Sequence, residues 1–343
     1  MIIPRDPYCS RRMVFRPDCS CNPPLVLFYT LGAMLSENTK GVFIVSVTPF
    51  LDTGEMDWRS VDSLTEFYIA KGVHGITILG MMGEAHKLTF EETEAFTRHV
   101  IRAVAGRIPV IVGISSPALA NIQALASIAM DVGAAGILLA PAAGLRTDEQ
   151  VFDYIGMVCR ALGPDSPIAY QDYPYSTGVY LSAALFHRMV RSYPQLVMLK
   201  HEDCPGLGKL SQIRTEAERE GLRRVSILVG NGGLYFPQEL RRGADGAMTG
   251  FAYPEMLVAV YERFKTGDIE GAEDIFDLYL PMIRYEQQPG FGLAVRKELL
   301  RRHGAIGSAR VRAPGPILTR TDIAELDNLQ LRLARALQQH SQR

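Results

Sequence analysis

Lys200 ends an apolar run in the segment 196–203, which reads LVMLKHED. A buried ammonium group is costly unless it is paired, so this lysine either reaches out to water or is held in place for chemistry. Side chains alternate along a strand, and we expect Leu196, Met198 and Lys200 to share one face. If that face is buried, loss of hydration disfavours the charged amine, and a neutral amine can attack a ketone to form a Schiff base.

A glycine-rich turn, GMMGE at 80–84, directly follows another apolar run. Two glycines three positions apart permit a tight turn whose backbone N–H groups can face an anion. A substrate carboxylate held by this turn beside a Schiff-base lysine would form a coherent site. The alternative is a plain structural joint, because glycine-rich turns often connect strands to helices.

Eight apolar runs alternate with segments of helical period, and these elements must position the lysine and the turn. The runs lie at 41–50, 75–80, 109–115, 136–141, 167–174, 196–202, 225–232 and 246–252. They are uniformly apolar, which indicates a parallel sheet covered on both faces. The pattern predicts an α/β fold, a (β/α)8 TIM barrel at 37–265, with Lys200 at the C-terminal end of the sixth strand, where such barrels carry their active sites. A doubly wound sheet is disfavoured because no phosphate fingerprint follows the first strand.

The two ends of the chain differ from this alternating part. Helical segments at 268–288, about 290–303 and 321–339 predict a C-terminal helical appendage at 266–343. Residues 1–36 are rich in Pro, Arg and Cys and have no helical or strand period. We expect a disordered extension or a mis-assigned start, with Met34 as the alternative first residue. A signal peptide is the competing interpretation, and the small-residue cleavage pattern that it requires is missing.

Composition excludes several classes of function. The 343 residues carry a formal net charge of -1, which gives no electrostatic reason to expect nucleic acid or an anionic membrane as a partner. No apolar run approaches the ~20 residues needed to span a bilayer. Three of the five cysteines lie in the first 21 residues and no disulfide framework is indicated, so a reducing, cytoplasmic location is expected. No H-x-H or H-E-x-x-H pair occurs, and we expect neither a metal nor a cofactor.

Several motifs together carry a resemblance to a known family. They are GMMGE after the second strand, a Tyr- and Pro-containing segment that ends in TG at 177–178, and a lysine 22 residues after that glycine, with VSVTPF, GNGG, GADGAMTG and APGP elsewhere. Over about residues 40–335 the chain resembles the dihydrodipicolinate synthase / N-acetylneuraminate lyase family of class I aldolases and lyases. The resemblance implies a (β/α)8 barrel, a usually tetrameric assembly, and Lys200 as the residue that forms a Schiff base with pyruvate or another 2-keto acid.

The departures from the family pattern concern proton transfer and specificity. Met81 and Met82 stand where the family carries two hydroxyl residues, and Gln171 stands at the position of its proton-shuttling tyrosine. Ser176 replaces the arginine that reads a second carboxylate in the synthases, and PAA at 141–143 replaces Pro-Tyr-Tyr. A glutamine cannot exchange protons near neutral pH. We therefore expect Tyr170 or Tyr173, brought inward by a bulge, or Asp172 or a water to serve as the relay, although these tyrosines could equally only pack.

Other candidates carry less weight. Glu84 is expected to hold its turn together, His86 could line the mouth of the site, and His201 should point away from the lysine. The loop GNGG at 230–233 could cradle a phosphate or let substrate approach the backbone. The residues expected to catalyse are Lys200, Tyr170, Tyr173 and Asp172. Those expected to bind substrate are Gly80, Met81, Met82, Gly83, Gln171, Ser176, Gly230, Asn231 and Gly232.

The sequence therefore predicts a class I lyase or aldolase. It would form a Schiff base between Lys200 and a 2-keto acid of the pyruvate or 2-keto-3-deoxy type, then cleave, condense or dehydrate at the adjacent carbon. Without the arginine, true dihydrodipicolinate synthesis is not expected. The rival interpretation is a family member that has lost turnover and serves as a keto-acid binding or scaffold protein, because the usual hydroxyl relay is missing.

Overall fold

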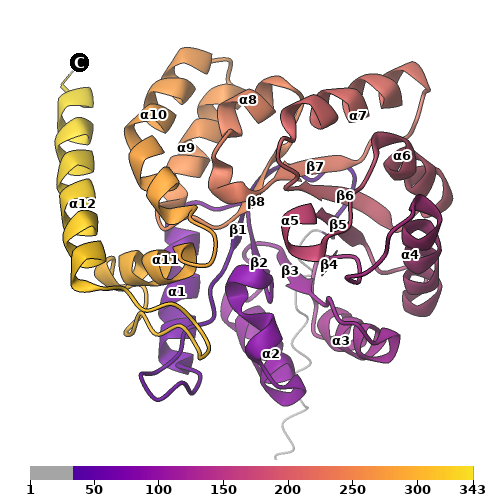
Figure 1. The fold of residues 1–343 in the computed structure, drawn as a ribbon, viewed down its shortest axis with the longest axis horizontal. Coiled ribbons are helices and arrows are strands. Elements are labelled where there is room, and N and C mark those ends of the chain that lie inside the picture. The colour runs from indigo at the N-terminus through magenta and orange to yellow at the C-terminus, as the bar shows by residue number, and fades with distance from the viewer. Residues whose placement is uncertain (1–33, 343) are drawn as a thin grey trace, which may run out of the picture.

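The computed structural model describes residues 34–342, which form a closed barrel of eight parallel strands (Figure 1). Each strand is hydrogen-bonded to the next, and the eighth closes on the first. The strands are β1 (Gly41–Val45), β2 (Gly75–Ile78), β3 (Val110–Gly113), β4 (Gly136–Leu139), β5 (Ile168–Asp172), β6 (Leu196–His201), β7 (Ser226–Val229) and β8 (Gly246–Thr249). Each lies inside one of the expected apolar runs, and the predicted TIM barrel is confirmed.

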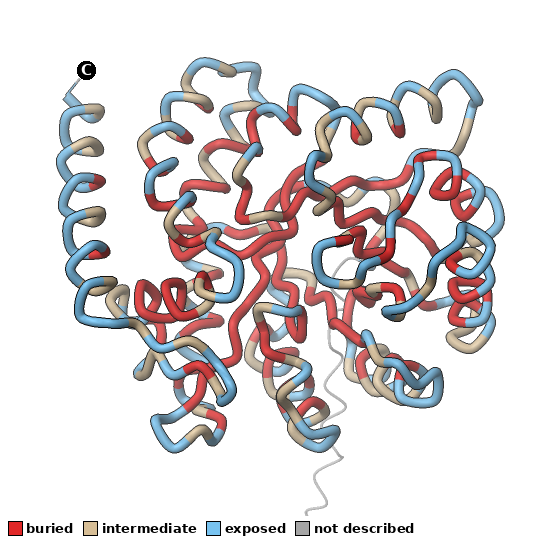
Figure 2. Tube along the Cα trace, in the orientation of Figure 1, coloured by how far each residue is buried: buried red, intermediate tan, exposed pale blue. Residues whose placement is uncertain are grey.

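Helices surround the strands, which are buried on both faces, as Figure 2 shows in red. The outer helices are α1 (Trp58–Ala70), α2 (Phe90–Val104), α3 (Leu119–Asp131), α4 (Asp148–Leu162), α6 (Ala183–Ser192), α7 (Leu207–Arg219), α8 (Phe236–Arg241) and α9 (Pro254–Lys265). Short helical segments follow three strands at their C-terminal ends: η1 (Met81–Gly83) and η2 (Ala85–Lys87) after β2, α5 (Pro174–Thr177) after β5, and η3 (Asn231–Gly233) after β7.

Local sequence signals start two of the long helices. Thr89 caps α2 and Thr147 caps α4, each in a capping box with the residue three positions later, Glu92 or Gln150. Such boxes satisfy two backbone N–H groups at the helix start that have no partner within the helix. The helices therefore begin at defined residues, which fixes the length of the loops at the mouth of the barrel.

The barrel interior is filled by one compact cluster of side chains. It contains Leu35, Phe43, Val45, Ile111, Leu138, Ala169, Val197, Met198, Leu228 and Met248. Leu35 closes the floor, where its backbone N–H donates to the oxygen of Ala135 just before β4. The described chain thus packs on the barrel from residue 35 onward, two residues before the expected boundary at 37. The rest of the predicted N-terminal extension, residues 1–33, lies outside the described residues.

Strand β6 contains one extra residue relative to β5. Ile168 pairs with Leu196 but Ala169 pairs with Met198, so Val197 forms a bulge. Leu196 consequently faces the outer helices, whereas Val197 and Met198 both face the interior. The expectation that Leu196 shares a face with Met198 and Lys200 is wrong for Leu196, because simple alternation does not hold across a bulge.

Three helices follow the barrel, close to the predicted segments: α10 (Ile269–Glu286), α11 (Gly292–Arg302) and α12 (Arg320–His340). Helix α10 packs against α9 and α12, and α12 stands at the edge of the molecule (Figure 1). The segment between α11 and α12 returns toward the barrel. Within residues 34–342, no helix is both long enough and apolar enough to cross a membrane.

Candidate active site

Lys200 lies at the C-terminal end of β6 and is 4% exposed. Its Nζ is 3.0 Å from Oε2 of Glu202, and the same oxygen accepts a 2.6 Å hydrogen bond from Nε2 of Gln171. Lysine, carboxylate and amide therefore meet at one point above the apolar filling of the barrel. The carboxylate offsets the cost of burying the ammonium, so the lysine is paired rather than isolated in an apolar place.

Strand pairing brings these three side chains together. Gln171 pairs with Lys200 across β5 and β6, so both point to the same side of the sheet. Glu202 follows the last residue of β6, and its backbone N–H donates to the oxygen of Asp172, which extends the alternation by one position. The third member of the group, Glu202, is thus placed by the same ladder that places the lysine.

The sequence interpretation missed Glu202. A signal for it was present, because Glu202 is two residues after Lys200 and the two share a face when the strand alternation continues. The relay was instead expected among Tyr170, Asp172 and Tyr173, in and after the fifth strand. A carboxylate in contact with the lysine is chemically able to accept and donate a proton, which Gln171 is not.

Two of the expected relay residues, Tyr170 and Asp172, lie on the opposite face of β5. Tyr170 belongs to the outer hydrophobic core, where burial raises the pKa of its phenol. Asp172 is fully buried beside α7, with Nζ of Lys209 2.6 Å and Nδ1 of His201 3.4 Å from its Oδ2. The bulge that would bring Tyr170 inward occurs in β6 instead, so neither residue lies beside Lys200. His201 faces outward as parity predicts, with Nε2 3.0 Å from the Gly206 oxygen.

Tyr173 is the expected relay residue that lies near the lysine group. It follows β5 and is half-buried. Burial raises its pKa to about 12, and the charge of Glu202 adds to the shift. It remains a protonated hydrogen-bond donor at neutral pH. Ser176, by contrast, is exposed on α5, and Ala143 after β4 is exposed as well.

The turn at 80–84 forms one wall of the barrel mouth. Met82 packs against the interior cluster, and Met81 is 43% exposed. Because η1 begins at Met81, the N–H groups of Met81 and Met82 have no partner within that helical turn. Glu84 is fully buried and receives Nζ of Lys297 at 2.6 Å and Nζ of Lys87 at 2.9 Å, so its place is structural.

The glycine-rich loop after β7 lies directly behind Glu202. Nδ2 of Asn231 donates to the backbone oxygen of Glu202 at 3.1 Å, and the N–H of Gly232 donates to Oγ1 of Thr249 at 2.7 Å. A Cβ atom at Gly230 would overlap the Glu202 side chain. The loop therefore leaves room for the carboxylate and supports the backbone that carries it.

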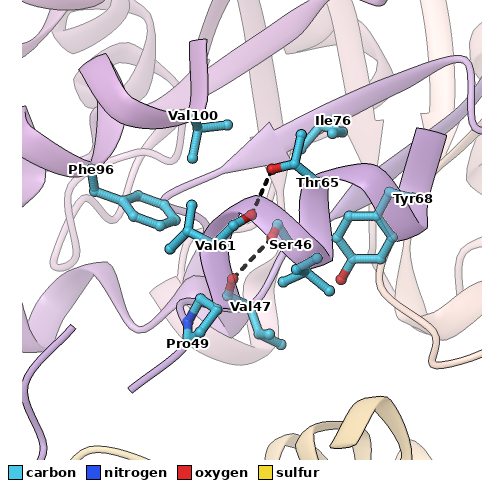
Figure 3. A pocket seen from close by; sticks show the side chains of 10 residues that line it. Ser46, Val47, Pro49, Val61, Thr65, Tyr68, Ile76, Phe96 and Val100 are labelled. Atoms are coloured by element: carbon cyan, nitrogen blue, oxygen red, sulfur yellow. Dashed lines mark hydrogen bonds between the residues drawn. The ribbon is translucent and has the colours of Figure 1, made fainter. Parts of the chain in front are cut away.

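Two hollows elsewhere in the described chain lie apart from this group. One is a cavity of about 10 Å³ between the exit of β1 and helices α1 and α2, lined by Ser46, Thr65, Tyr68 and Phe96 among others (Figure 3). This is room for about one water molecule. The other, about 340 Å³, lies between α6 and α7 at the N-terminal end of β7, the far end of the barrel from Lys200. Neither hollow contains the lysine group.

The fold and site together define a TIM-barrel protein with a paired lysine at the C-terminal face of the barrel, where proteins of this fold carry their active sites. The Dihydrodipicolinate synthetase family matches residues 38–330. The chain is 32% identical over 297 residues to the L-2-keto-3-deoxyarabonate dehydratase of Azospirillum brasilense, covering 84% of this chain and 92% of that protein. It is 32% identical over 236 residues to the 4-hydroxy-tetrahydrodipicolinate synthase of Sorangium cellulosum, covering 68% and 76%.

Among solved structures, dihydrodipicolinate synthase from Rhodopseudomonas palustris superposes with a TM-score of 0.85 at 44% identity, covering 88% of this chain and 99% of that chain. The chain belongs to the dihydrodipicolinate synthase family, and it is a lyase of that family. The resemblance found from the sequence motifs is thereby confirmed.

Proposed function

We propose that this enzyme forms a Schiff base between Lys200 and a 2-keto acid and then dehydrates a 2-keto-3-deoxy sugar acid or a similar hydroxylated keto acid. The observation that supports this most is the contact of 3.0 Å between Nζ of Lys200 and Oε2 of Glu202. A nucleophilic amine and an acid–base group are the two requirements of imine-based elimination. The similarity to a 2-keto-3-deoxyarabonate dehydratase over 84% of the chain supports dehydration as the reaction.

In the first steps, the Lys200 ammonium transfers a proton to Glu202 and the neutral amine attacks C2 of the keto acid. The resulting carbinolamine loses its oxygen as water when Glu202 returns the proton, which leaves a protonated imine. This cation withdraws electrons from C3 and makes its hydrogen acidic. The proton count balances, because the one proton that Glu202 accepts is used to release water.

Elimination follows at the neighbouring carbons. The Glu202 carboxylate removes a proton from C3, and the electron pair forms an enamine. The enamine then expels the C4 hydroxyl, which leaves as water after it receives the proton. Water hydrolyses the conjugated imine and regenerates the amine. Gln171 holds the Glu202 carboxylate in position through its bond of 2.6 Å, and Tyr173 supplies a neutral phenol nearby.

The substrate carboxylate would bind at the turn 80–84, through the N–H groups of Met81 and Met82. The loop with Gly230, Asn231 and Gly232 would act on substrate through Glu202, because it leaves room for that side chain and holds its backbone. The glycines at 80 and 83 would let the turn adopt its tight shape. Because Ser176 is exposed and uncharged, the site has no guanidinium at that position to fix a second carboxylate. This supports a hydroxylated keto acid as substrate rather than the partner used in dihydrodipicolinate synthesis. We also propose a homotetramer, by family resemblance.

The rival role, a keto-acid binding protein without turnover, rested on the missing hydroxyl relay. Glu202 provides a replacement for that relay within contact distance of the lysine. The enzymatic role and the binding role predict different results for one variant, Glu202→Gln. If Glu202 serves turnover, Glu202→Gln should lower kcat by about 10²- to 10⁴-fold, the usual size of a general acid–base contribution.

The test is borohydride trapping with pyruvate and with L-2-keto-3-deoxyarabonate, followed by peptide mass spectrometry. We expect one reduced adduct, on Lys200, and turnover of the second compound. Lys200→Ala should lose both the adduct and turnover while it remains folded, and Lys71→Ala, at the C-cap of α1, should retain both. An adduct on another lysine, or none with any 2-keto acid, would show that the mechanism is wrong. Trapping without turnover of any substrate would favour the binding role.

A further inference from the structure

The segment between α11 and α12 is joined to the turn 80–84 by a network of charged and polar contacts, which we call the clamp: Thr48, Glu84, Lys87, Lys297, the backbone oxygen of Arg310, and Arg312. The two halves of the clamp are more than 200 residues apart in the chain. Lys297 and Glu84 are both fully buried. Nothing in the proposed chemistry uses these charges, so their presence needs a separate explanation.

Lys297 uses all three of its N–H bonds within the clamp. Its Nζ donates to Oε1 of Glu84 at 2.6 Å, to the oxygen of Thr48 at 2.8 Å and to the oxygen of Arg310 at 2.8 Å. It also lies 4.5 Å from the centroid of the Phe50 ring. One side chain of α11 thereby joins the exit of β1, the turn after β2 and the C-terminal segment.

Arg312 completes the clamp from the other side. Its backbone N–H donates to Oε2 of Glu84 at 3.0 Å, and its guanidinium forms two bonds of 2.7 Å to the carboxylate of Glu92. The guanidinium carbon lies 4.4 Å from the centroid of the Phe50 ring, so Phe50 contacts the charged groups of both Lys297 and Arg312. The C-terminal segment is therefore fixed against the start of α2 as well as against the turn.

The turn itself has a backbone shape that needs support. Glu84 has φ 55° and ψ 29°, a left-handed conformation that is unfavourable for residues other than glycine. Oγ1 of Thr48 donates to the oxygen of Gly83 at 2.6 Å, directly before this residue. The clamp holds the side chain of Glu84 and the carbonyl of Gly83, the two residues that directly follow Met81 and Met82 in the turn.

We propose that Lys297 and Arg312 are positioning residues for substrate binding: through Glu84 they hold the turn 80–84 in the shape that receives the carboxylate of the keto acid. This inference rests on the proposed function of the turn. The C-terminal segment then sets the affinity for the keto acid, although it contributes no group to the chemistry at Lys200.

The experiment measures how borohydride trapping of Lys200 depends on pyruvate concentration. Lys297→Met should raise the half-saturating pyruvate concentration by roughly tenfold or more, the size expected when a charged hydrogen bond is misplaced. The trapping rate at saturating pyruvate should stay within about threefold of wild type, because the lysine and its carboxylate are unchanged. Thr48→Val, which removes only the bond to Gly83, should shift the half-saturation in the same direction and tests the inference if Lys297→Met does not fold.

Arg296→Met is the matched control. Arg296 is the neighbour of Lys297 on α11, is 2% exposed and pairs with Glu286 at 2.6 Å, away from the turn. The Arg296→Met variant should have a lower melting temperature, as Lys297→Met does. Its half-saturating pyruvate concentration should stay within about twofold of wild type. Equal shifts of the half-saturating pyruvate concentration in Arg296→Met and Lys297→Met would overturn the inference. So would the absence of a shift in both Lys297→Met and Thr48→Val. A wild-type protein without any adduct on Lys200 would instead overturn the proposed function.

Discussion

Glu239 is a second buried carboxyl group in the neighbourhood of Glu202. It lies on α8, is 6% exposed, and its Oε2 has no hydrogen-bond partner among the described residues. Burial raises its pKa to about 8, and the charge of Glu202 adds to the shift. The carboxyl group of Glu239 therefore keeps its proton at neutral pH.

The raised pKa of Glu239 predicts that the free energy of unfolding depends on pH. The folded protein binds the Glu239 proton more tightly than the unfolded chain, so the stabilising effect is complete below the ordinary pKa and is lost as pH rises toward 8. Relative to Glu239→Gln, wild type should lose up to about 1.4 kcal/mol of unfolding free energy per pH unit between pH 5.5 and 7.5. Urea unfolding of both proteins at several pH values measures this. Parallel pH dependences would contradict the prediction.

At the scale of elements, the loop after β7 is fitted to the carboxylate of Glu202. A methyl group at Gly230 would occupy the volume of that side chain, so Gly230→Ala should displace Glu202 and lower kcat about tenfold or more. Gly208, in α7, has open space around its Cβ position and a helical environment. Gly208→Ala should therefore retain full activity and gain up to about 1 kcal/mol in stability.

The two variants are compared by steady-state kinetics and by thermal melting. A Gly230→Ala protein with wild-type kcat would show that Glu202 either moves freely or takes no part in the reaction.

The strands and helices were predictable because the residues of each element carry the hydrophobic pattern of that element. Uniform apolar runs gave all eight strands, and helical period gave α10 to α12 to within a few residues. Lys200 followed from its place at the end of such a run. These features depend on neighbours in sequence, and burial on both faces of a parallel sheet leaves a direct mark on composition.

Contacts between distant segments were not predictable in the same way. The pairing of Glu84 with Lys297 joins positions 213 residues apart, and no periodic pattern connects them. The inward placement of Tyr170 failed because the bulge lies in β6, at Val197, rather than in β5. Which strand contains an extra residue is decided by register against its neighbour, and a single apolar run does not reveal it.

At the scale of the whole molecule, the loops after β2, β4 and β5 carry uncharged side chains at the positions expected to face substrate. Ser176 is neutral and exposed, Ala142 and Ala143 are small, and Met81 and Met82 are apolar and pliable. We predict negligible condensation of pyruvate with aspartate semialdehyde, because the loss of a charged bond to a substrate carboxylate weakens binding roughly 10- to 150-fold. Dehydration of a longer hydroxylated keto acid should be accepted.

Steady-state kinetics with aspartate semialdehyde checks this prediction against dehydration of L-2-keto-3-deoxyarabonate in the same preparation. A kcat/KM for the semialdehyde above about 10⁴ M⁻¹s⁻¹ lies within the range of an enzyme on its own substrate. Such a value would contradict the prediction and indicate a dihydrodipicolinate synthase.

The bulge at Val197 divides β6 into two parts with different tolerance to changes in chain length. Removal of Val197 would leave Leu196 outward, Met198 inward, Leu199 outward and Lys200 inward, a regular strand with the lysine still in the barrel. Removal or insertion of one residue between Met198 and Lys200 would turn the amine toward the outer helices. Loss of one residue at the bulge is therefore compatible with the site, whereas the five residues 198–202 form a segment of fixed length.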